Sequence, residues 1–354
     1  MTTNRKIEHL ALCATEDVES GKTGFDDIRF IHNALPEVSK ATVDVTAQFL
    51  GRRFDSPVFI AGMTGGHTET IRVNAALAEA AEQLNIGIGV GSQRAAIEHP
   101  EQVDSFSIVR ERAPSAFVVA NVGALQVKEY DSETIDRLID MVEADALAIH
   151  LNFLQEAIQK EGDTNAEGCL EAIESVAKSI RIPVIAKETG AGISKEVAGE
   201  LEMAGVSAVD VGGTGGTSWA RVEAYRAQDN PMIERLGALY ENWGIPSAVS
   251  VVEASRLPVI ATGGIRNGLH VAKSTALGAS LCGMGLPLLK PALQGPKEVT
   301  SEIRAVVEEL KVAMFLTGCR TLTDLKTRPL IITGETRQVL QQRGFNLMKL
   351  QAGR

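Results

Sequence analysis

The sequence predicts an α/β protein in which eight parallel strands alternate with helices and close into a (β/α)₈ TIM barrel. Three observations support this fold class: eight short apolar runs recur along the chain, helix-length stretches separate most of them, and each run ends in glycine or polar residues. Apolar runs of about four to eight residues without strict alternation are typical of parallel strands buried on both faces. In such barrels the functional groups lie at the carboxyl ends of the strands.

The predicted elements follow one another in a regular order. The strands begin at Ser56, Leu84, Ala116, Ala146, Pro183, Ala208, Pro258 and Gly278. Residues 67–85, 132–145 and 194–205 repeat apolar residues at three- and four-residue spacing, which predicts helices with one buried stripe. The sixth and seventh strands are about 50 residues apart, and this long interval indicates an insertion at residues 218–247. Because the insertion follows the carboxyl end of a strand, we expect it to form a lid.

The barrel, expected at residues 56–290, has an extension at each end within a single domain spanning 1–354. Residues 1–55 are polar with turn signals and include a predicted hairpin at 41–54, and this extension either closes the barrel floor or reaches the top. The first residues, "NRKIEH", have no apolar context and by default form a mobile tail. Residues 291–354 are helical in pattern, with a helix ending at Gly318, and are expected to pack outside the barrel.

Charge and composition exclude several classes of function. The 354-residue chain has 45 acidic and 35 basic residues and a formal net charge of −10, which argues against a general nucleic-acid or anionic-membrane surface. Apolar stretches fall short of the roughly 18 residues that span a bilayer. The four cysteines lack metal-type spacing and the amino terminus does not resemble a secretory signal, so we expect a cytoplasmic protein.

Glycines after the last two strands are candidates for a phosphate site. The segments "TGGIRNG" and "GMGLP" place Gly263, Gly264 and Gly285 where barrels commonly bind phosphate with backbone amides. An isolated glycine pair more often serves only a tight turn. Two consecutive pairs after the seventh and eighth strands favour the phosphate cup.

The densest polar cluster follows the fourth strand, in "HLNFLQE". His150 and Asn152 share one face of the strand, and Gln155 and Glu156 follow in the loop. Asn and His side chains can bind an anion, and a single carboxylate beside a substrate diphosphate is enough for Mg²⁺. Taken alone, His150 is more often a satisfied core histidine and Glu156 a solvated loop residue.

Two basic residues also end strands. Lys187 closes the fifth strand, where a buried ammonium needs a carboxylate, a phosphate or an electron-rich ring as partner. An ion pair with a neighbouring strand fits its spacing equally well, and the adjacent Glu188 is expected to point elsewhere. Arg94, after the second strand, carries the fork of donors that suits a phosphate.

An ordered series of motifs covers nearly the whole chain. In sequence these are "RKIEH", "GMTGG", "GVGSQR", "ANVG", "HLNFLQE", "VIAKETG", "GGTGGTSW" and "ATGGIRNG". Together they closely resemble the type 2 isopentenyl-diphosphate isomerases, a family of flavin enzymes of isoprenoid biosynthesis. The resemblance implies interconversion of isopentenyl and dimethylallyl diphosphate on FMN reduced by NADPH, with Mg²⁺, in a homo-oligomer that is a tetramer or octamer.

The resemblance also implies roles for individual residues. The flavin would be lined by Gly62, Met63, Thr64, Ser92, Asn121, Lys187 and Thr217, with Gly264, Ile265, Arg266, Gly285 and Leu286 around its phosphate. The substrate would meet Arg5, Lys6, Ser92, Gln93, Arg94, His150, Asn152 and Gln155, and Glu156 would ligate Mg²⁺. In this case Arg5 and Lys6 fold over a diphosphate instead of forming a mobile tail.

The implied reaction adds a proton at one carbon and removes one from another, so no net electrons move. A reduced flavin can act as acid and base and stabilise carbocation character. Lys187 near the ring would favour its anionic form, which removes the need for a carboxylate partner. Among the catalytic candidates Gln155, His150 and Asn152, Gln155 either assists proton transfer or orients the substrate. We hypothesise that Trp219 helps to exclude water.

Two other classes of function compete with this one. A 2-hydroxy-acid oxidase would use a late His and Arg pair, and "ATGGIRNG" lacks the histidine before its arginine; an enzyme resembling inosine-monophosphate dehydrogenase would use a loop cysteine, which "GGTGGTSWARVE" lacks. A flavin or phosphate sensor without turnover is the non-enzymatic alternative, because fold alone does not determine function. The polar cluster at 150–156 argues against a sensor.

Overall fold

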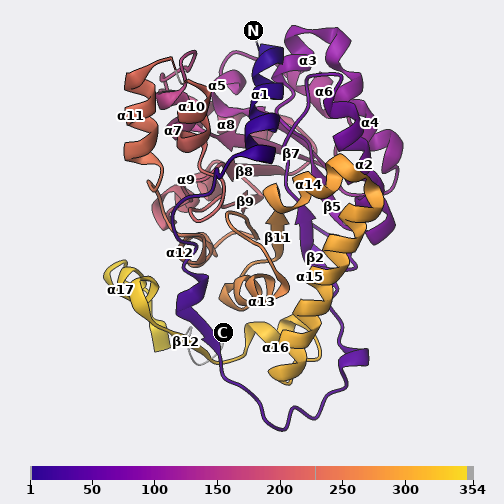
Figure 1. Ribbon diagram of the computed structural model, residues 1–354, viewed down its shortest axis with the longest axis vertical. Coiled ribbons are helices and arrows are strands. Elements are labelled where there is room, and N and C mark those ends of the chain that lie inside the picture. The colour runs from indigo at the N-terminus through magenta and orange to yellow at the C-terminus, as the bar shows by residue number, and fades with distance from the viewer. Residues whose placement is uncertain (1, 228, 349–354) are drawn as a thin grey trace.

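The computed structural model describes residues 2–227 and 229–348, in which eight parallel strands close into a barrel (Figure 1). The order around the barrel follows the sequence, and the last strand pairs with the first through Cys282 and Val58. This confirms the predicted fold class and all eight predicted strands. The strands are β4 (Val58–Ile60), β5 (Gly87–Gly89), β6 (Val118–Gly123), β7 (Ala146–Leu151), β8 (Val184–Glu188), β9 (Ala208–Asp210), β10 (Val259–Ala261) and β11 (Leu281–Met284).

Helices surround the barrel because each has an apolar stripe that packs on the strands. The predicted helices at 67–85, 132–145 and 194–205 are confirmed as α2 (Thr70–Leu84), α6 (Ser132–Asp140) and α9 (Lys195–Met203). The side chains of Asp131 and Ser194 cap the last two by accepting backbone N–H groups. The other helices of this ring are α3 (Arg94–Glu98), α4 (Asp104–Arg112), α5 (Ala124–Val127), α7 (Phe153–Ile158), α8 (Cys169–Ser179), α12 (Ser247–Glu253) and α13 (Gly268–Leu277).

The amino-terminal extension reaches both ends of the barrel. The predicted hairpin is confirmed as β2 (Ala47–Phe49) and β3 (Arg52–Phe54), and Phe54 packs at 5.7 Å on Phe117, which precedes β6, so the hairpin closes the floor. The first residues form a helix, α1 (Thr2–Thr15), so the default of a mobile tail is wrong. Its Leu10 and Cys13 pack against the core, and this tertiary contact outweighs a locally polar sequence.

The carboxyl-terminal extension packs outside the barrel, mostly as helices (Figure 1). The long α15 (Pro296–Leu316) lies along the barrel beside α2 and α13 and is followed by Gly318 with φ +68°, as predicted. The flanking helices are α14 (Leu286–Gln294), α16 (Leu322–Lys326) and α17 (Gly334–Gln342). No described helix is long and apolar enough to cross a membrane.

A short strand that the sequence pattern does not predict joins the two extensions. β12 (Leu330–Ile332) pairs antiparallel with β1 (Ile28–Phe30). The two extensions therefore form one outer layer, although about 300 residues of chain separate the paired strands.

The insertion after the sixth strand forms two helices at the carboxyl end of the barrel. These are α10 (Trp219–Arg226) and α11 (Pro231–Tyr240), and α10 packs against α11, α1 and α7 (Figure 1). Residues from the start of the chain and from its middle thereby meet over the same end of the barrel.

Candidate active site at the mouth of the barrel

Two adjoining cavities open at the carboxyl ends of the strands. The first, of about 170 Å³, lies among the segments that follow β4, β8, β9, β10 and β11. The second, of about 130 Å³, lies over the ends of β5, β6 and β7, beside α1 and α7. Lys6, His9, Met63, Lys187 and Trp219 border both cavities. Ligands bound in the two cavities would therefore lie next to each other.

The first cavity collects most of the residues that the resemblance assigns to a flavin. Ser92 and Asn121 border the second cavity instead, and Ile265 borders neither because its side chain is fully buried. Those that border the first cavity are Gly62, Met63, Thr64, Lys187, Thr217, Gly264, Arg266, Gly285 and Leu286.

Glycine turns form one wall of this cavity. Gly263 and Gly264 follow β10 with φ values of +95° and +73°, which favour glycine. A Cβ on Gly263 would collide with the carbonyl oxygen of Gly213, and one on Gly264 with that of Gly215. The glycines are thus required by tight turns, and they also leave bare backbone facing the cavity. Gly285 is the residue before α14, whose amino terminus lies at the same wall.

Arg266 stands beside the glycine wall and is ion-paired with Glu19. Burial lowers the pKa of its guanidinium to about 10, which indicates that it lacks full hydration. An anionic group in this cavity would restore the solvation that the arginine has lost.

The second cavity brings together nearly all the residues assigned to the substrate. They come from α1, from the β5–α3 turn and from β7 with the following α7. The residues bordering it include Arg5, Lys6, Ser92, Arg94, His150, Asn152, Gln155 and Glu156.

Gln93 is the exception among the predicted substrate contacts. Its side chain is 0 % exposed and does not border either cavity. The amide nitrogen donates to the carbonyl oxygen of Leu138 at 2.8 Å, and the amide oxygen accepts from the backbone N–H of Asn121 at 2.8 Å. Because both ends of the amide are occupied by the protein, we correct its role to support of the β6 end.

Positive charge is concentrated at the second cavity. Burial, followed by repulsion from Arg5 and Arg94, lowers the pKa of the Lys6 ammonium to about 8. Within the described part of the chain, no carboxylate lies at ion-pair distance from Lys6, whereas Arg94 is paired with Glu98 at 2.5 Å. A buried, poorly compensated cation between two guanidinium groups is a site for a multiply charged anion.

His150 is neutral in this environment. Burial and the nearby charges of Lys6 and Lys187 lower the pKa of its imidazole to about 3. Its Nδ1 lies 2.9 Å from the side-chain oxygen of Asn121, so Nδ1 carries the hydrogen and Nε2 is left as an acceptor. The structure therefore places His150 beside the substrate cavity as a neutral, oriented ring.

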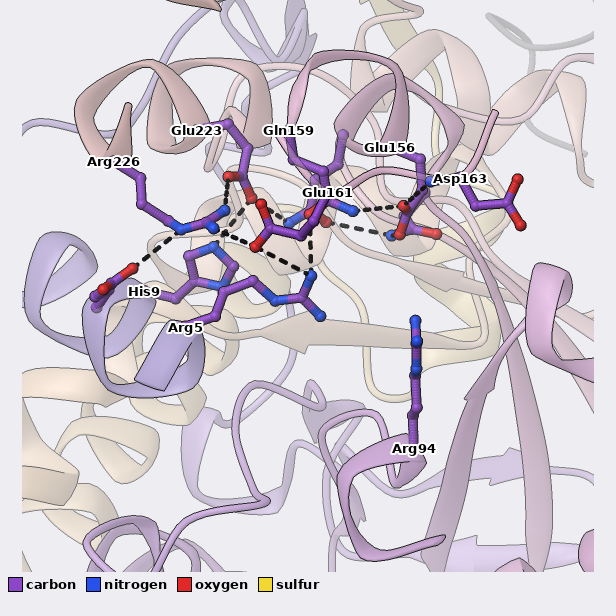
Figure 2. Close-up of polar contacts among 12 residues, drawn as sticks. Arg5, His9, Arg94, Glu156, Gln159, Glu161, Asp163, Glu223 and Arg226 are labelled. Atoms are coloured by element: carbon purple, nitrogen blue, oxygen red, sulfur yellow. Dashed lines mark hydrogen bonds and ion pairs between the residues drawn. The ribbon is translucent and has the colours of Figure 1, made fainter. Parts of the chain in front are cut away.

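A carboxylate absent from the predicted site, Glu223 on α10, lies at the centre of a hydrogen-bond network (Figure 2). Its Oε1 accepts from the amide of Gln155 at 2.7 Å and lies 3.0 Å from His9 Nε2, and its Oε2 accepts from Arg226 at 2.5 Å. Burial alone would raise the pKa of Glu223, but these partners hold it below its usual range. The carboxylate is therefore ionised and fixes the Gln155 amide.

Arg226 connects the segments that form this side of the cavity. Besides Glu223 it binds Glu8 of α1 at 3.0 Å and Glu161 of the loop after α7 (Figure 2). Arg5 lies 3.8 Å from the same Glu161 carboxylate. α1, the loop after α7 and α10 are thus joined by ion pairs around the mouth.

Glu156 is the candidate metal ligand, and its carboxylate is fully engaged by neighbours. Oε1 accepts from the Asn152 amide at 3.0 Å, and Oε2 accepts from the backbone N–H of Asp163 at 2.9 Å and from the Gln159 amide. No group of three His, Cys, Asp or Glu side chains suited to a metal occurs among the described residues. The site fits Mg²⁺ only if a ligand in the cavity supplies oxygen atoms.

Lys187 has a carboxylate partner on a neighbouring strand, which confirms the ion pair that its spacing left open, although the resemblance had removed the need for one. Its Nζ lies 3.6 Å from Oδ2 of Asp210 on the neighbouring β9. The adjacent Glu188 points away as predicted, and its Oε2 accepts three backbone N–H groups at Gly190, Ala191 and Gly192.

Neither the histidine after Arg266 nor the cysteine nearest the first cavity is placed for the chemistry of the competing enzymes. His270 does not border either large cavity: it packs on Phe25 at 5.2 Å, with Nδ1 3.2 Å from the carbonyl oxygen of Gly264. Cys13 borders the first cavity, but burial raises its pKa to about 11, which disfavours the thiolate.

Comparison with known proteins identifies the family. The model of the FMN-dependent dehydrogenase family matches residues 13–127 and 146–332. Curated proteins named isopentenyl-diphosphate delta-isomerase are similar over almost their whole length. One, from Methanosarcina mazei, is 55% identical over 99% of this chain and 97% of its own. The chain belongs to the isopentenyl-diphosphate delta-isomerase family. The similar isomerase of Archaeoglobus fulgidus is 52% identical over 97% of this chain and 99% of its own.

Solved structures support the fold of this isomerase-family member. The recombinant flavin-binding domain of baker's yeast flavocytochrome b2 is similar with a TM-score of 0.67 and 19% identity, covering 96% of this chain and 88% of that chain. A lactate oxidase from Pediococcus acidilactici is similar with a TM-score of 0.64 and 18% identity, covering 92% and 87%. At this identity the likeness shows the barrel fold alone.

Proposed function

We propose that the chain interconverts isopentenyl diphosphate and dimethylallyl diphosphate by a 1,3-allylic proton shift, using reduced FMN and Mg²⁺. The observation that carries this proposal is the pair of joined cavities with different walls. One is lined by glycine backbone with Lys187, and the other by cations and amides. A cofactor in the first cavity and a diphosphate in the second would touch where Lys187 and Trp219 border both.

The residues of the first cavity fit FMN. Backbone at Gly264 and Gly285, the α14 amino terminus and Arg266 suit its phosphate, and Met63, Thr64 and Lys187 surround the space left for the ring. Once bound and reduced, FMN supplies an electron-rich ring with labile protons.

The second cavity fits an allylic diphosphate with its charged end toward α1. Arg5, Lys6 and Arg94 bind the diphosphate, and Ser92 adds a hydroxyl at the same wall. Glu156 holds Mg²⁺ jointly with diphosphate oxygens, because it is a single carboxylate. The neutral His150 and Asn152 orient the substrate without adding charge near its hydrocarbon part.

Gln155, held by Glu223, is the polar group of the chain best placed to orient or relay a proton at the substrate. The 2.7 Å bond from its amide to Glu223, and the contact of His9 with the same oxygen, connect it to a titratable pair. Trp219 packs edge-on at 5.1 Å against His9 and covers both cavities, so it excludes water from the carbocation-like state.

The direct test is an anaerobic incubation with FMN, Mg²⁺ and isopentenyl diphosphate, with and without NADPH. Dimethylallyl diphosphate formed in large excess over NADPH consumed supports a redox-neutral isomerase with NADPH as reductant of the flavin. NADPH consumed in step with substrate, or no product, would contradict the proposal and favour an oxidoreductase or a sensor.

The remaining parts of the proposal concern the setting of the enzyme. We propose a cytoplasmic homo-oligomer, tetrameric or octameric, of a chain that folds as one domain, with 56–290 as barrel and 1–55 and 291–354 as extensions. The pairing of β1 with β12 supports a single unit. Light scattering tests the assembly, and a single unfolding transition tests the domain.

A further inference from the structure

A buried acid lies one layer below the two large cavities. Asp210 is 2 % exposed and stands opposite Lys187 in the register of β8 and β9. Its Oδ2 is 3.6 Å from the Lys187 ammonium, and its Oδ1 accepts a hydrogen bond from the Thr262 hydroxyl. The backbone N–H of Gly212 donates to that hydroxyl at 2.8 Å. Side chains from β8 and from the residue after β10, the two neighbours of β9, thus fix one carboxylate inside the barrel.

Asp210 is connected to the large cavities through the two side chains that it contacts, Lys187 and Thr262. It borders neither of them, but faces a third cavity of about 10 Å³ inside the barrel together with Lys187 and Asn121. This volume is close to the space of a single water molecule. Lys187 borders all three cavities and is therefore the only described basic residue that connects the buried acid with the site.

Burying a carboxylate at this position costs free energy, so the charge of Asp210 requires an explanation. The interior layers of such barrels are usually filled by branched apolar side chains. Burial raises the pKa of Asp210, and the Lys187 ammonium opposes that rise. The neighbouring Glu188 shows a structural alternative, because it binds three backbone N–H groups of one turn. Asp210 instead directs its second oxygen at a lysine of the site.

We propose that Asp210 is a positioning residue that holds the Lys187 ammonium in place at the wall of the first cavity. Through Lys187 it favours the reduced, electron-rich state of a bound flavin. This inference rests on the function proposed above, because it needs FMN beside Lys187. An unpaired buried ammonium loses its proton or moves to solvent, and in both cases the flavin loses its positive neighbour.

The test uses the FMN-loaded enzyme with Asp210→Asn and measures the affinity for oxidised and for reduced FMN under anaerobic conditions. The ratio of the two affinities is expected to shift about tenfold against the reduced form, which corresponds to about 30 mV for a two-electron couple. The kcat for isomerisation should fall by a larger factor than KM for the diphosphate rises, because Asp210 itself does not border the substrate cavity.

A double-mutant cycle separates action through Lys187 from a general effect. Lys187→Met should shift the affinity ratio at least as far, and adding Asp210→Asn to it should cause no further shift. Glu253→Gln is the matched control, because Glu253 is also a buried carboxylate paired with a basic residue, Arg343 at 2.7 Å, but lies away from the cavities. It should lower stability without changing the ratio.

Several outcomes would overturn the inference. An unchanged affinity ratio in Asp210→Asn would do so, as would an equal shift in the Lys187→Met background. Should Asp210→Asn fail to fold, Thr262→Val, which removes the hydroxyl that holds Asp210, is expected to give a smaller shift in the same direction, and no shift would count against us. A wild-type enzyme that isomerises while Asp210→Asn leaves the ratio unchanged overturns this inference alone; a wild-type chain that binds no FMN overturns the proposed function as well.

Discussion

The two cavities adjoin each other but differ in the kind of residue that lines them. The first is bordered by strand ends and glycine turns of the barrel, with α1 and Trp219 along one side. The second is bordered mainly by polar side chains, several of which come from α1 and α7 outside the barrel. His9 and Glu223, which meet at 3.0 Å on this side, are 214 residues apart in the chain.

This contrast predicts a difference in tolerance. A backbone wall is preorganised by the strands, and a side chain added to it has nowhere to go. Where the wall consists of hydrogen-bonded side chains, one of them can be replaced without loss of the fold, and the replacement lowers activity more than it lowers stability. We therefore expect variants of the first cavity to abolish cofactor binding and variants of the second to spare it.

The largest effect is expected from Gly264→Ala. The added Cβ would collide with the Gly215 carbonyl, at a residue with φ +73°, so FMN binding should become undetectable by flavin fluorescence. Gly344→Ala is the control, because φ is +80° there but no atom lies within 4 Å of the new Cβ. It should cost only about 1 kcal/mol of stability and bind FMN normally. Equal FMN binding by both variants would show that the glycine wall is not needed.

The next effect sharpens the comparison from the other side. Glu223→Gln should lower kcat about 100-fold, because the Gln155 amide loses its ionised acceptor, while FMN affinity stays within about twofold. Steady-state kinetics and a flavin titration measure the two quantities. Glu8→Gln, which affects only an exposed partner of Arg226, should reduce kcat much less. An unchanged kcat in Glu223→Gln would remove Glu223 from the mechanism.

A pH profile should distinguish the cavities without mutation. The pKa of Lys6 is lowered to about 8, so its positive charge is present below that pH and is lost as the pH rises through it. The kcat/KM for the diphosphate is expected to fall about tenfold per pH unit above pH 8, while FMN affinity changes little there. In Lys6→Arg the guanidinium stays charged, and the decline should disappear. A decline that persists in this variant belongs to another group.

The smallest effect on activity is expected at Gln93. Gln93→Leu leaves the carbonyl of Leu138 and the N–H of Asn121 without partners, so the free energy of unfolding should drop by about 1 to 3 kcal/mol. The KM for the diphosphate should stay within about twofold, because Gln93 borders neither cavity. Urea unfolding and steady-state kinetics provide the measurements. A large rise in KM with normal stability would restore Gln93 as a substrate contact.

The barrel was predictable because each strand is short, apolar and ended by glycine or polar residues. The residues that end the strands include Gly264, His150 and Lys187, which the pattern predicts at the mouth of the barrel and which the structure has there. The helix α1 was not predictable from its polar sequence, since it depends on packing against the core and on charges that lie far along the chain.

The two carboxylates missing from the predicted site left only weak signals. Glu223 lies four residues after Trp219, which places it on the same face of the inserted helix. Asp210 is the single acidic residue in the apolar run "AVDV", and a charged residue is rarely buried without a partner. In neither case does the sequence name the partner, because Gln155 and Lys187 come from other strands and helices.

The contact between α1 and α10, which lie far apart in the sequence, also affects when the enzyme can complete its folding during synthesis on the ribosome. His9 is made before its partner Glu223, which follows 214 positions later. At synthesis rates of about 5–20 residues per second, the first helix waits roughly 10 to 40 s before its docking surface exists. The α1 part of the substrate side is therefore made well before the α10 part that completes it, and the polar, charged surface of α1 is compatible with exposure to water during that interval.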